Sequence, residues 1–111
     1  MPVVPTLDLT RSSDGDGRDV LRVVGDVDLA TAPRLVKAVE QWLDSGSVGP
    51  IRLDLSGVTF LDSTGIGALL TIRNAASAAG TRVEVLEHST AVARVLSLAG
   101  VADLFVPAHD G

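Results

Sequence analysis

The chain has 111 residues, of which 46% are hydrophobic and 21% charged. This composition fits a globular domain with a hydrophobic core, and the chain is too short for two such domains. Its formal net charge of −5 argues against attraction of the whole chain to nucleic acid or to an anionic membrane surface. Cysteine is absent, so disulfides, thiolate metal sites and cysteine nucleophiles are excluded.

The N-terminal residues Met1 to Asp8 show no positively charged segment followed by an apolar one. No apolar run approaches the roughly 18 residues that a membrane-spanning helix needs. We therefore expect a cytoplasmic protein that forms a single domain over residues 1–111.

Two strands are predicted near the N-terminus, because Leu7 and Leu9 alternate with polar residues and half of the residues in Asp19–Val24 are β-branched. They should form a hairpin around Arg11–Arg18. The connecting segment resembles half of a calcium-binding loop, but Arg18 occupies the third alternate position and no glutamate closes the loop. The pattern favours a turn over a calcium site.

The first helix is predicted after Gly25-Asp26-Val27-Asp28, and we interpret Asp26 as a turn residue. Pro33 fits the first helical turn, where its missing N–H has no intrahelical partner to lose. Asp28 and Thr31 both qualify as the capping residue. Apolar residues recur at helical spacing as far as Gly46, and they are Leu29, Ala32, Leu35, Val36, Val39, Trp42 and Leu43.

The second half of the chain repeats the order strand, helix, strand, helix. Ile51–Leu55 and Thr81–Leu86 alternate as strands with one better-buried face, and Leu104–Val106 is a candidate last short strand. A helix ending at Gly80 follows the first of these strands, and Ser89-Thr90 should cap the helix that follows the second. Phe60 and Trp42 are expected in the core.

These elements predict an α/β domain. The sheet should be mixed, mainly parallel and four- to five-stranded, opened by the N-terminal β-hairpin and accompanied by three main helices. Because its strands alternate instead of being apolar throughout, we expect the helices mostly on one face. The other face would then be partly solvated or covered by the N-terminal segment.

The stretch Gly57–Gly67 joins a strand to a helix and contains the residues best suited to a functional site. Ser63 should lie beside free backbone N–H groups at a helix start, which favour an anion. It does not match a hydrolase nucleophile, because that turn needs Gly-x-Ser-x-Gly and the only imidazoles are His88 and His109. Gly65-Ile66-Gly67 likewise lacks the remaining residues of a nucleotide-binding loop.

Phe60-Leu61-Asp62-Ser63-Thr64-Gly65-Ile66-Gly67 resembles the phosphorylation loop of bacterial anti-sigma factor antagonists, which belong to the STAS-domain family. Gly25-Asp26-Val27-Asp28 resembles the turn that opens the family's first helix. Val92–Phe105 is similar to the family's late Val-x-x-x-Leu…Gly-Val/Leu…Phe stretch. The resemblance covers roughly residues 19–106 and implies a STAS-like fold.

The resemblance also implies a role for each matching residue. Ser63 would accept phosphate from a serine kinase that is itself the anti-sigma factor, and a serine phosphatase would reset it. Asp28, Asp62, Thr64 and Gly65, together with Ser63, would contact that partner. The unphosphorylated protein would bind the kinase and free a sigma factor, with no catalytic residue, metal, cofactor, direct nucleic-acid contact or membrane contact.

Other interpretations stay open at the level of sequence. Ser63 or Asp62 would also fit an ordinary helix cap, and Thr64 a first-turn residue without a further role. The whole domain would then be a scaffold or sensor that binds a protein or small ligand without being phosphorylated. An enzyme is disfavoured, because no general base, metal cluster or complete phosphate loop is present.

Overall fold

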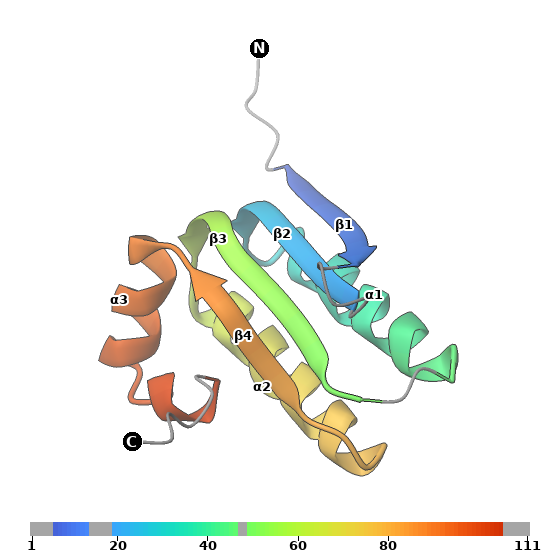
Figure 1. The fold of residues 1–111 in the computed structure, drawn as a ribbon. Coiled ribbons are helices and arrows are strands. Elements are labelled where there is room, and N and C mark those ends of the chain that lie inside the picture. The colour runs from blue at the N-terminus through green and yellow to red at the C-terminus, as the bar shows by residue number, and fades with distance from the viewer. Residues whose placement is uncertain (1–5, 14–18, 47–48, 106–111) are drawn as a thin grey trace.

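The computed structural model describes residues 6–13, 19–46 and 49–105, and the elements below lie within these ranges. Three strands and three helices follow an N-terminal strand, in an order that alternates after the first two strands (Figure 1). The elements are β1 (Leu7–Ser13), β2 (Asp19–Val27), α1 (Ala32–Asp44), β3 (Ile51–Leu61), α2 (Ser63–Ala78), β4 (Val83–His88), α3 (Thr90–Leu98) and the 3-10 helix η1 (Ala102–Leu104).

The four strands form one sheet in the order β1-β2-β3-β4. β1 pairs with β2 in antiparallel register, whereas β2 with β3 and β3 with β4 pair in parallel. The predicted mixed, mainly parallel sheet opened by a hairpin is therefore confirmed.

Arg11 of β1 stacks over the Trp42 ring of α1, 4.3 Å from its centroid. This contact attaches the edge strand to the helix layer.

The predicted last strand at Leu104–Val106 is wrong in its described part. Ala102–Leu104 forms the 3-10 helix η1, and Val106 lies outside the described residues. The Phe105 carbonyl still accepts a hydrogen bond of 3.1 Å from the Val85 backbone N–H, at the outer edge of β4. The turn of η1 directs the Phe105 ring into the core instead of continuing a ladder beside β4.

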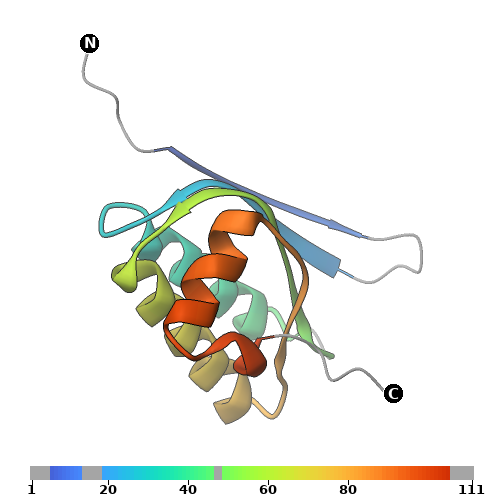
Figure 2. The same ribbon diagram turned by 90° about the vertical axis from the view of Figure 1, so that its left-hand side faces the viewer.

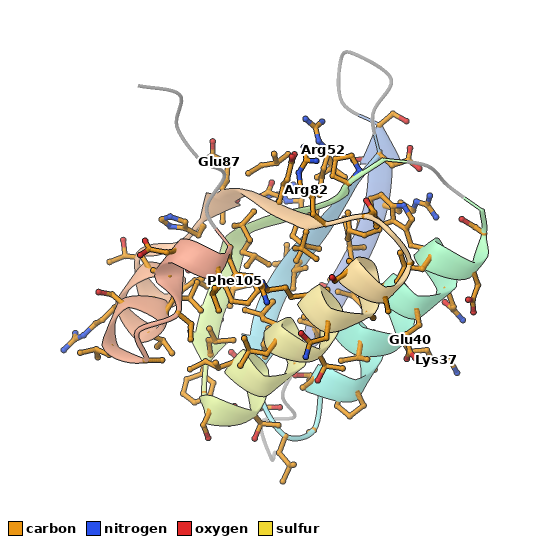
Figure 3. All side chains as sticks on the ribbon, turned by 90° about the horizontal axis from the view of Figure 1, so that it is seen from below. Lys37, Glu40, Arg52, Arg82, Glu87 and Phe105 are labelled. Atoms are coloured by element: carbon orange, nitrogen blue, oxygen red, sulfur yellow. The ribbon has the colours of Figure 1, made fainter. Side chains whose placement is uncertain are left out.

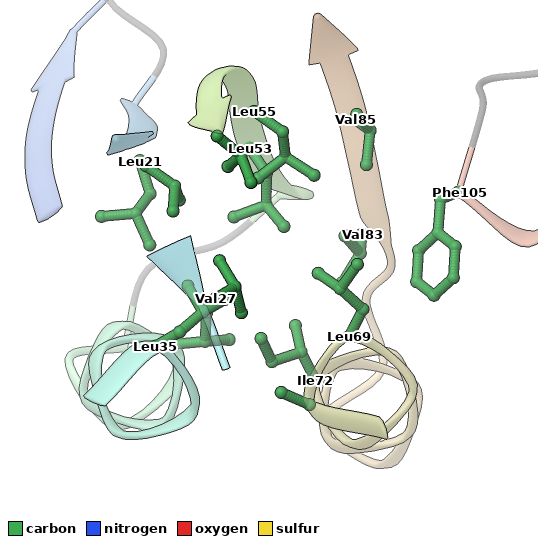
Figure 4. Packing of buried hydrophobic residues seen from close by; sticks show 14 of the residues in the cluster. Leu21, Val27, Leu35, Leu53, Leu55, Leu69, Ile72, Val83, Val85 and Phe105 are labelled. Atoms are coloured by element: carbon green, nitrogen blue, oxygen red, sulfur yellow. The ribbon is translucent and has the colours of Figure 1, made fainter. Parts of the chain in front are cut away.

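The helices cover one face of the sheet, as expected from the alternating strands (Figure 2). α1 and α2 pack side by side beneath the sheet, with α2 against β3 and β4, while α3 packs against β3 and η1. Aliphatic side chains from both layers fill the space between them (Figure 4). Among the most completely buried are Val23, Leu35, Val39, Leu53, Leu55, Leu69, Ile72 and Phe105.

The other face of the sheet carries charged side chains. Arg52 and Arg82 lie on the side away from the helices, whereas Phe105 points between the layers (Figure 3). Glu84 forms ion pairs with both arginines, at 3.5 Å to Arg52 and 2.7 Å to Arg82. Arg22 and Ser56 are exposed, so this face is partly solvated in the described part of the chain.

β3 contains two bulges that decide which of its side chains are buried. Its register with β2 shifts twice, and each shift adds one residue to β3. The pairs on either side of the two shifts are Arg22↔Asp54 and Val24↔Gly57, then Gly25↔Val58 and Asp26↔Phe60. As a result the buried positions are spaced by two and then by three residues, and they are Ile51, Leu53, Leu55, Val58 and Leu61.

The bulges explain why the core prediction for Phe60 is wrong. The first bulge shifts the buried phase to Val58, from which a step of two would bury Phe60, but the second bulge lies between these residues and leaves the Phe60 ring outward. Phe60 is 50% exposed, whereas Trp42 is buried as expected. Gly57, next to the first bulge, has no room for a side chain, since a Cβ would lie 2.8 Å from Cγ2 of Val24.

The first helix is shorter than the apolar spacing predicts. α1 begins at Ala32, so Leu29 lies in the turn before it and is 76% exposed. The predicted C-terminal ends of the later helices agree with the structure. Gly80 and Gly100 each follow a helix, and both have the positive φ of left-handed terminal glycines. Ser89 caps α3 by accepting a hydrogen bond from the Val92 N–H.

Burial predicts opposite outcomes for two leucines of the helices. Leu69 is 1% exposed and Leu98 is 80% exposed. We expect Leu69→Ala to lower the free energy of unfolding by about 2–5 kcal/mol, because it leaves a cavity between α2 and the sheet. Leu98→Ala should change it by less than about 0.5 kcal/mol. Urea unfolding followed by circular dichroism measures both, and equal losses would contradict the packing described here.

Candidate functional site

The candidate site lies where the parallel strands β2 and β3 end together. Val27 and Leu61 are the last paired residues, and Asp28 and Asp62 leave the sheet directly after them. The Asp62 N–H points at the Val27 carbonyl oxygen at 3.4 Å, which extends the pairing into the turn. The carboxyl edge of parallel strands is the usual place for function in α/β sheets, because their loops converge there.

Asp62 is the N-cap of α2, and Ser63 is the first residue of that helix. The Asp62 carboxylate accepts a hydrogen bond of 3.0 Å from the Gly65 N–H. Ser63 is exposed and Thr64 is half-buried. Within the described residues no hydrogen bond occupies the Ser63 hydroxyl. Of the two cap candidates here, Asp62 is therefore the cap, and Ser63 is left accessible to a partner.

Gly65 is required by close packing and not by an unusual backbone angle. A Cβ at this position would overlap Cδ1 of Leu61 and lie 2.7 Å from the Val27 carbonyl oxygen. Gly67 differs, because nothing lies within 4 Å of a Cβ built there. The first glycine therefore brings the start of α2 against the end of β2, whereas the second meets no steric demand from this chain.

Asp28 holds the turn between β2 and α1. Its Oδ1 accepts hydrogen bonds from the Ala30 N–H at 3.0 Å and the Thr31 N–H at 3.1 Å. The buried Thr31 hydroxyl donates to the Asp26 carbonyl at 2.6 Å and accepts from the Asp28 N–H at 3.0 Å. Thr31 takes the N-cap position without a side-chain cap bond, so both candidates contribute to the helix start.

Asp26 and Thr59 were not predicted to interact. Asp26 lies in β2 instead of a turn, and its Oδ1 accepts a hydrogen bond of 3.0 Å from the Thr59 hydroxyl. This bond spans β2 and β3 at the second bulge of β3. The sequence signal that could have found it is the change of apolar spacing from two residues to three at Leu55, Val58 and Leu61.

The described residues offer little to metal or acid–base chemistry. No group of three or more His, Asp or Glu side chains in this part of the chain is placed to hold a metal ion. His88 is exposed at the end of β4, and His109 lies outside the described ranges. None of the helices found in these ranges is long and apolar enough to cross a bilayer.

The chain was compared with known families and proteins. The family model described as "Mlab, STAS domain" matches residues 10–107, which include every element that builds the site. The chain belongs to the STAS-domain family. Among curated proteins, the anti-sigma-B factor antagonists of Listeria monocytogenes and Listeria innocua are each 27% identical to it over 95 residues. The match covers 85% of this chain and 81% of each relative.

Solved structures of anti-sigma factor antagonists have the same fold. An anti-sigma factor antagonist from Mycobacterium paratuberculosis is 29% identical, with a TM-score of 0.75 over 95% of this chain and 89% of the other. The unphosphorylated anti-sigma factor antagonist SpoIIAA is 22% identical, with a TM-score of 0.67 over 96% of this chain and 90% of the other. The second likeness supports the fold alone.

The two glycines of the site give a matched test of its geometry. Gly65→Ala should lower the free energy of unfolding by about 1–3 kcal/mol, because the new Cβ meets the Val27 backbone oxygen. Gly67→Ala should raise it by up to about 1 kcal/mol, because alanine favours the helix and fits open space. Urea unfolding of both variants checks the signs, and a Gly65→Ala protein as stable as wild type would contradict the packing at the end of β2.

Proposed function

We propose that this STAS domain is an anti-sigma factor antagonist switched by phosphorylation of Ser63. Its unphosphorylated form binds an anti-sigma factor that is also a serine kinase, and this binding frees a sigma factor for transcription. Phosphorylation of Ser63 ends the binding, and a serine phosphatase restores it. The chain itself is a phosphoacceptor and binding protein of the cytoplasm and not an enzyme.

The observation that supports this proposal most directly is the exposed Ser63 at the first position of α2. A kinase can approach its hydroxyl without unfolding the helix, and no hydrogen bond within the described residues has to be broken first. Asp62, Thr64 and Gly65 surround the hydroxyl along the chain. Asp28 leaves β2 beside Asp62, so the partner surface proposed for Asp28, Asp62, Ser63 and Thr64 comes from two neighbouring turns, and the buried Gly65 supports it from beneath.

A phosphate on Ser63 should leave the fold intact. It would add about −1.5 to −2 charges at the N-terminus of α2, where the helix dipole favours negative charge. The Asp62 carboxylate already occupies that terminus through its bond to the Gly65 N–H. The helix dipole thus attracts the phosphate, whereas the Asp62 carboxylate repels it. The main consequence of phosphorylation falls on the surface that a partner covers.

The partner's nucleotide explains how one phosphate ends binding. A kinase holds the terminal phosphate of ATP in line with the hydroxyl it modifies. After transfer, a phosphate on Ser63 would face the remaining nucleotide phosphates across the interface. An unpaired interfacial charge costs about 2–5 kcal/mol, and a hundredfold loss of affinity needs only about 2.7 kcal/mol. The switch therefore needs no large conformational change in this domain.

A second candidate function keeps the fold and removes the phosphorylation. In it the domain is a scaffold or sensor that binds a protein partner or a small ligand. The family description names Mlab, whereas the curated relatives are named anti-sigma-B factor antagonists, and one fold can serve different functions. The same surface would then be used in a single, permanently unmodified state.

Phosphorylation of Ser63 can be tested directly. The purified chain is incubated with ATP and each anti-sigma factor kinase of its source organism, and the intact mass is measured. We expect wild type and Thr64→Val to gain one phosphate and Ser63→Ala to gain none, because Thr64 supplies a matched neighbouring hydroxyl. Phosphate on Ser63→Ala, or none on wild type with a kinase proven active on another substrate, would refute the site assignment.

The binding consequence needs its own measurement. Ser63→Asp places a negative charge at the position of the phosphate, so its affinity for the same kinase should fall by about tenfold or more, measured by calorimetry. Ser63→Ala should bind within about threefold of wild type. Equal affinities of wild type and Ser63→Asp would favour the scaffold function.

A further inference from the structure

Phe60 stands out among the aromatic residues of the chain. The sequence contains one Trp, two Phe and no Tyr. Trp42 and Phe105 are 3% and 1% exposed, whereas Phe60 is 50% exposed. The remaining aromatic ring is thus partly in water, three residues before Ser63. A large apolar ring in water is unfavourable for an isolated protein, and exposed rings of this kind are frequent anchors in protein interfaces.

The exposure of Phe60 is built into the strand. The second bulge of β3 lies between the pairs Gly25↔Val58 and Asp26↔Phe60. The 3.0 Å hydrogen bond from the Thr59 hydroxyl to Asp26 holds this bulge against β2. Leu61 then returns to the core at 5% exposure, so Phe60 cannot turn inward without displacing it. Bulges commonly re-aim side chains near functional sites in this way.

Leu29 supplies a second apolar group at the same end of the sheet. It follows Asp28 in the turn after β2 and is 76% exposed. The hydrogen bonds from Ala30 and Thr31 to Asp28 hold the backbone of this turn. Leu29 and Phe60 thus belong to the two neighbouring strand ends that also carry Asp28 and Ser63.

The two segments that carry these apolar side chains contain acidic residues only, and the next basic residues along the chain are Arg34 and Arg73. Residues 26–33 and 56–72 contain Asp26, Asp28 and Asp62 and no Lys, Arg or His. A second copy of this chain seated here would bring carboxylates against carboxylates, which costs energy. An anionic membrane surface would be repelled in the same way. The surface suits a protein that presents an apolar pocket next to a basic side chain.

We propose that Phe60 and Leu29 are the apolar anchors of the interface with the anti-sigma factor, an inference that rests on the proposed function. The partner's apolar pocket receives these side chains, and a basic side chain of the partner lies against Asp28 on the β2 side. Ser63 lies on the β3 side and faces the nucleotide. The basic group is therefore separated from the position of the phosphate.

The test measures binding of the anti-sigma factor kinase that phosphorylates or binds the wild-type chain. Phe60→Ala and Leu29→Ala should each weaken the affinity about 10- to 100-fold, as truncation of an interface anchor does. Phe60→Leu, which keeps an apolar side chain, should lose less than Phe60→Ala. Leu98→Ala is the control matched to Leu29→Ala, because it removes an equally exposed leucine from α3, and it should bind within about twofold of wild type.

The controls separate this inference from the proposed function. Urea unfolding must show that each variant is folded under the binding conditions, with Phe60→Leu replacing Phe60→Ala if the latter is not. Wild-type affinity should also fall as NaCl is raised from low to high concentration, because the basic contact is screened. Salt-independent binding would overturn the basic contact.

Affinities of Phe60→Ala and Leu29→Ala within twofold of wild type would overturn the anchors, even where Ser63→Asp still loses binding. Absence of wild-type binding to every anti-sigma factor of the organism would overturn the proposed function and this inference together. Self-association of the wild type that Phe60→Ala abolishes, seen by analytical ultracentrifugation, would reassign the surface to a second copy of the chain.

Discussion

The contact between Gly65 and the end of β2 is the constraint on which the site depends. Only a residue without a side chain lets the first turn of α2 lie against the Val27 carbonyl and the Leu61 side chain. That contact ties together β2, β3 and α2 at one point. It places the exposed Ser63 beside the turn held by Asp28, so that two segments more than thirty residues apart form one surface.

β3 connects this surface to the core. Its first residues alternate between a face packed on the helices and a charged, solvated face. Two bulges then change the spacing of its buried residues, so the strand that carries the core also presents Phe60 outward before it ends at Leu61. With the first bulge alone, steps of two from Val58 would have buried Phe60, and the second bulge keeps its ring outward. Successive parts of the same strand thus contribute to the core and to the proposed interface.

Most of the fold could be predicted because it depends on local patterns. The alternation in Ile51–Leu55, the terminal glycine at Gly80 and the cap at Ser89 each act within a few residues, and the structure has all three. The errors concern contacts between distant segments. Phe60 is exposed because of the pairing of β3 with β2, and the candidate strand after Leu104 is replaced by a 3-10 turn that sends Phe105 into the core. No local pattern in those residues specifies either contact.

The carboxylates of the site are held in place before any partner arrives. Asp62 is bound to the first turn of α2, Asp28 to the turn before α1, and Asp26 to Thr59. Each therefore has a structural role that keeps its charge in a defined position. A phosphate on Ser63 would add charge to a surface whose acids cannot swing away without loosening a helix start or a bulge. In the proposed switch, the domain stays rigid and the interface takes up the whole electrostatic change, so a single modification at Ser63 would be sufficient.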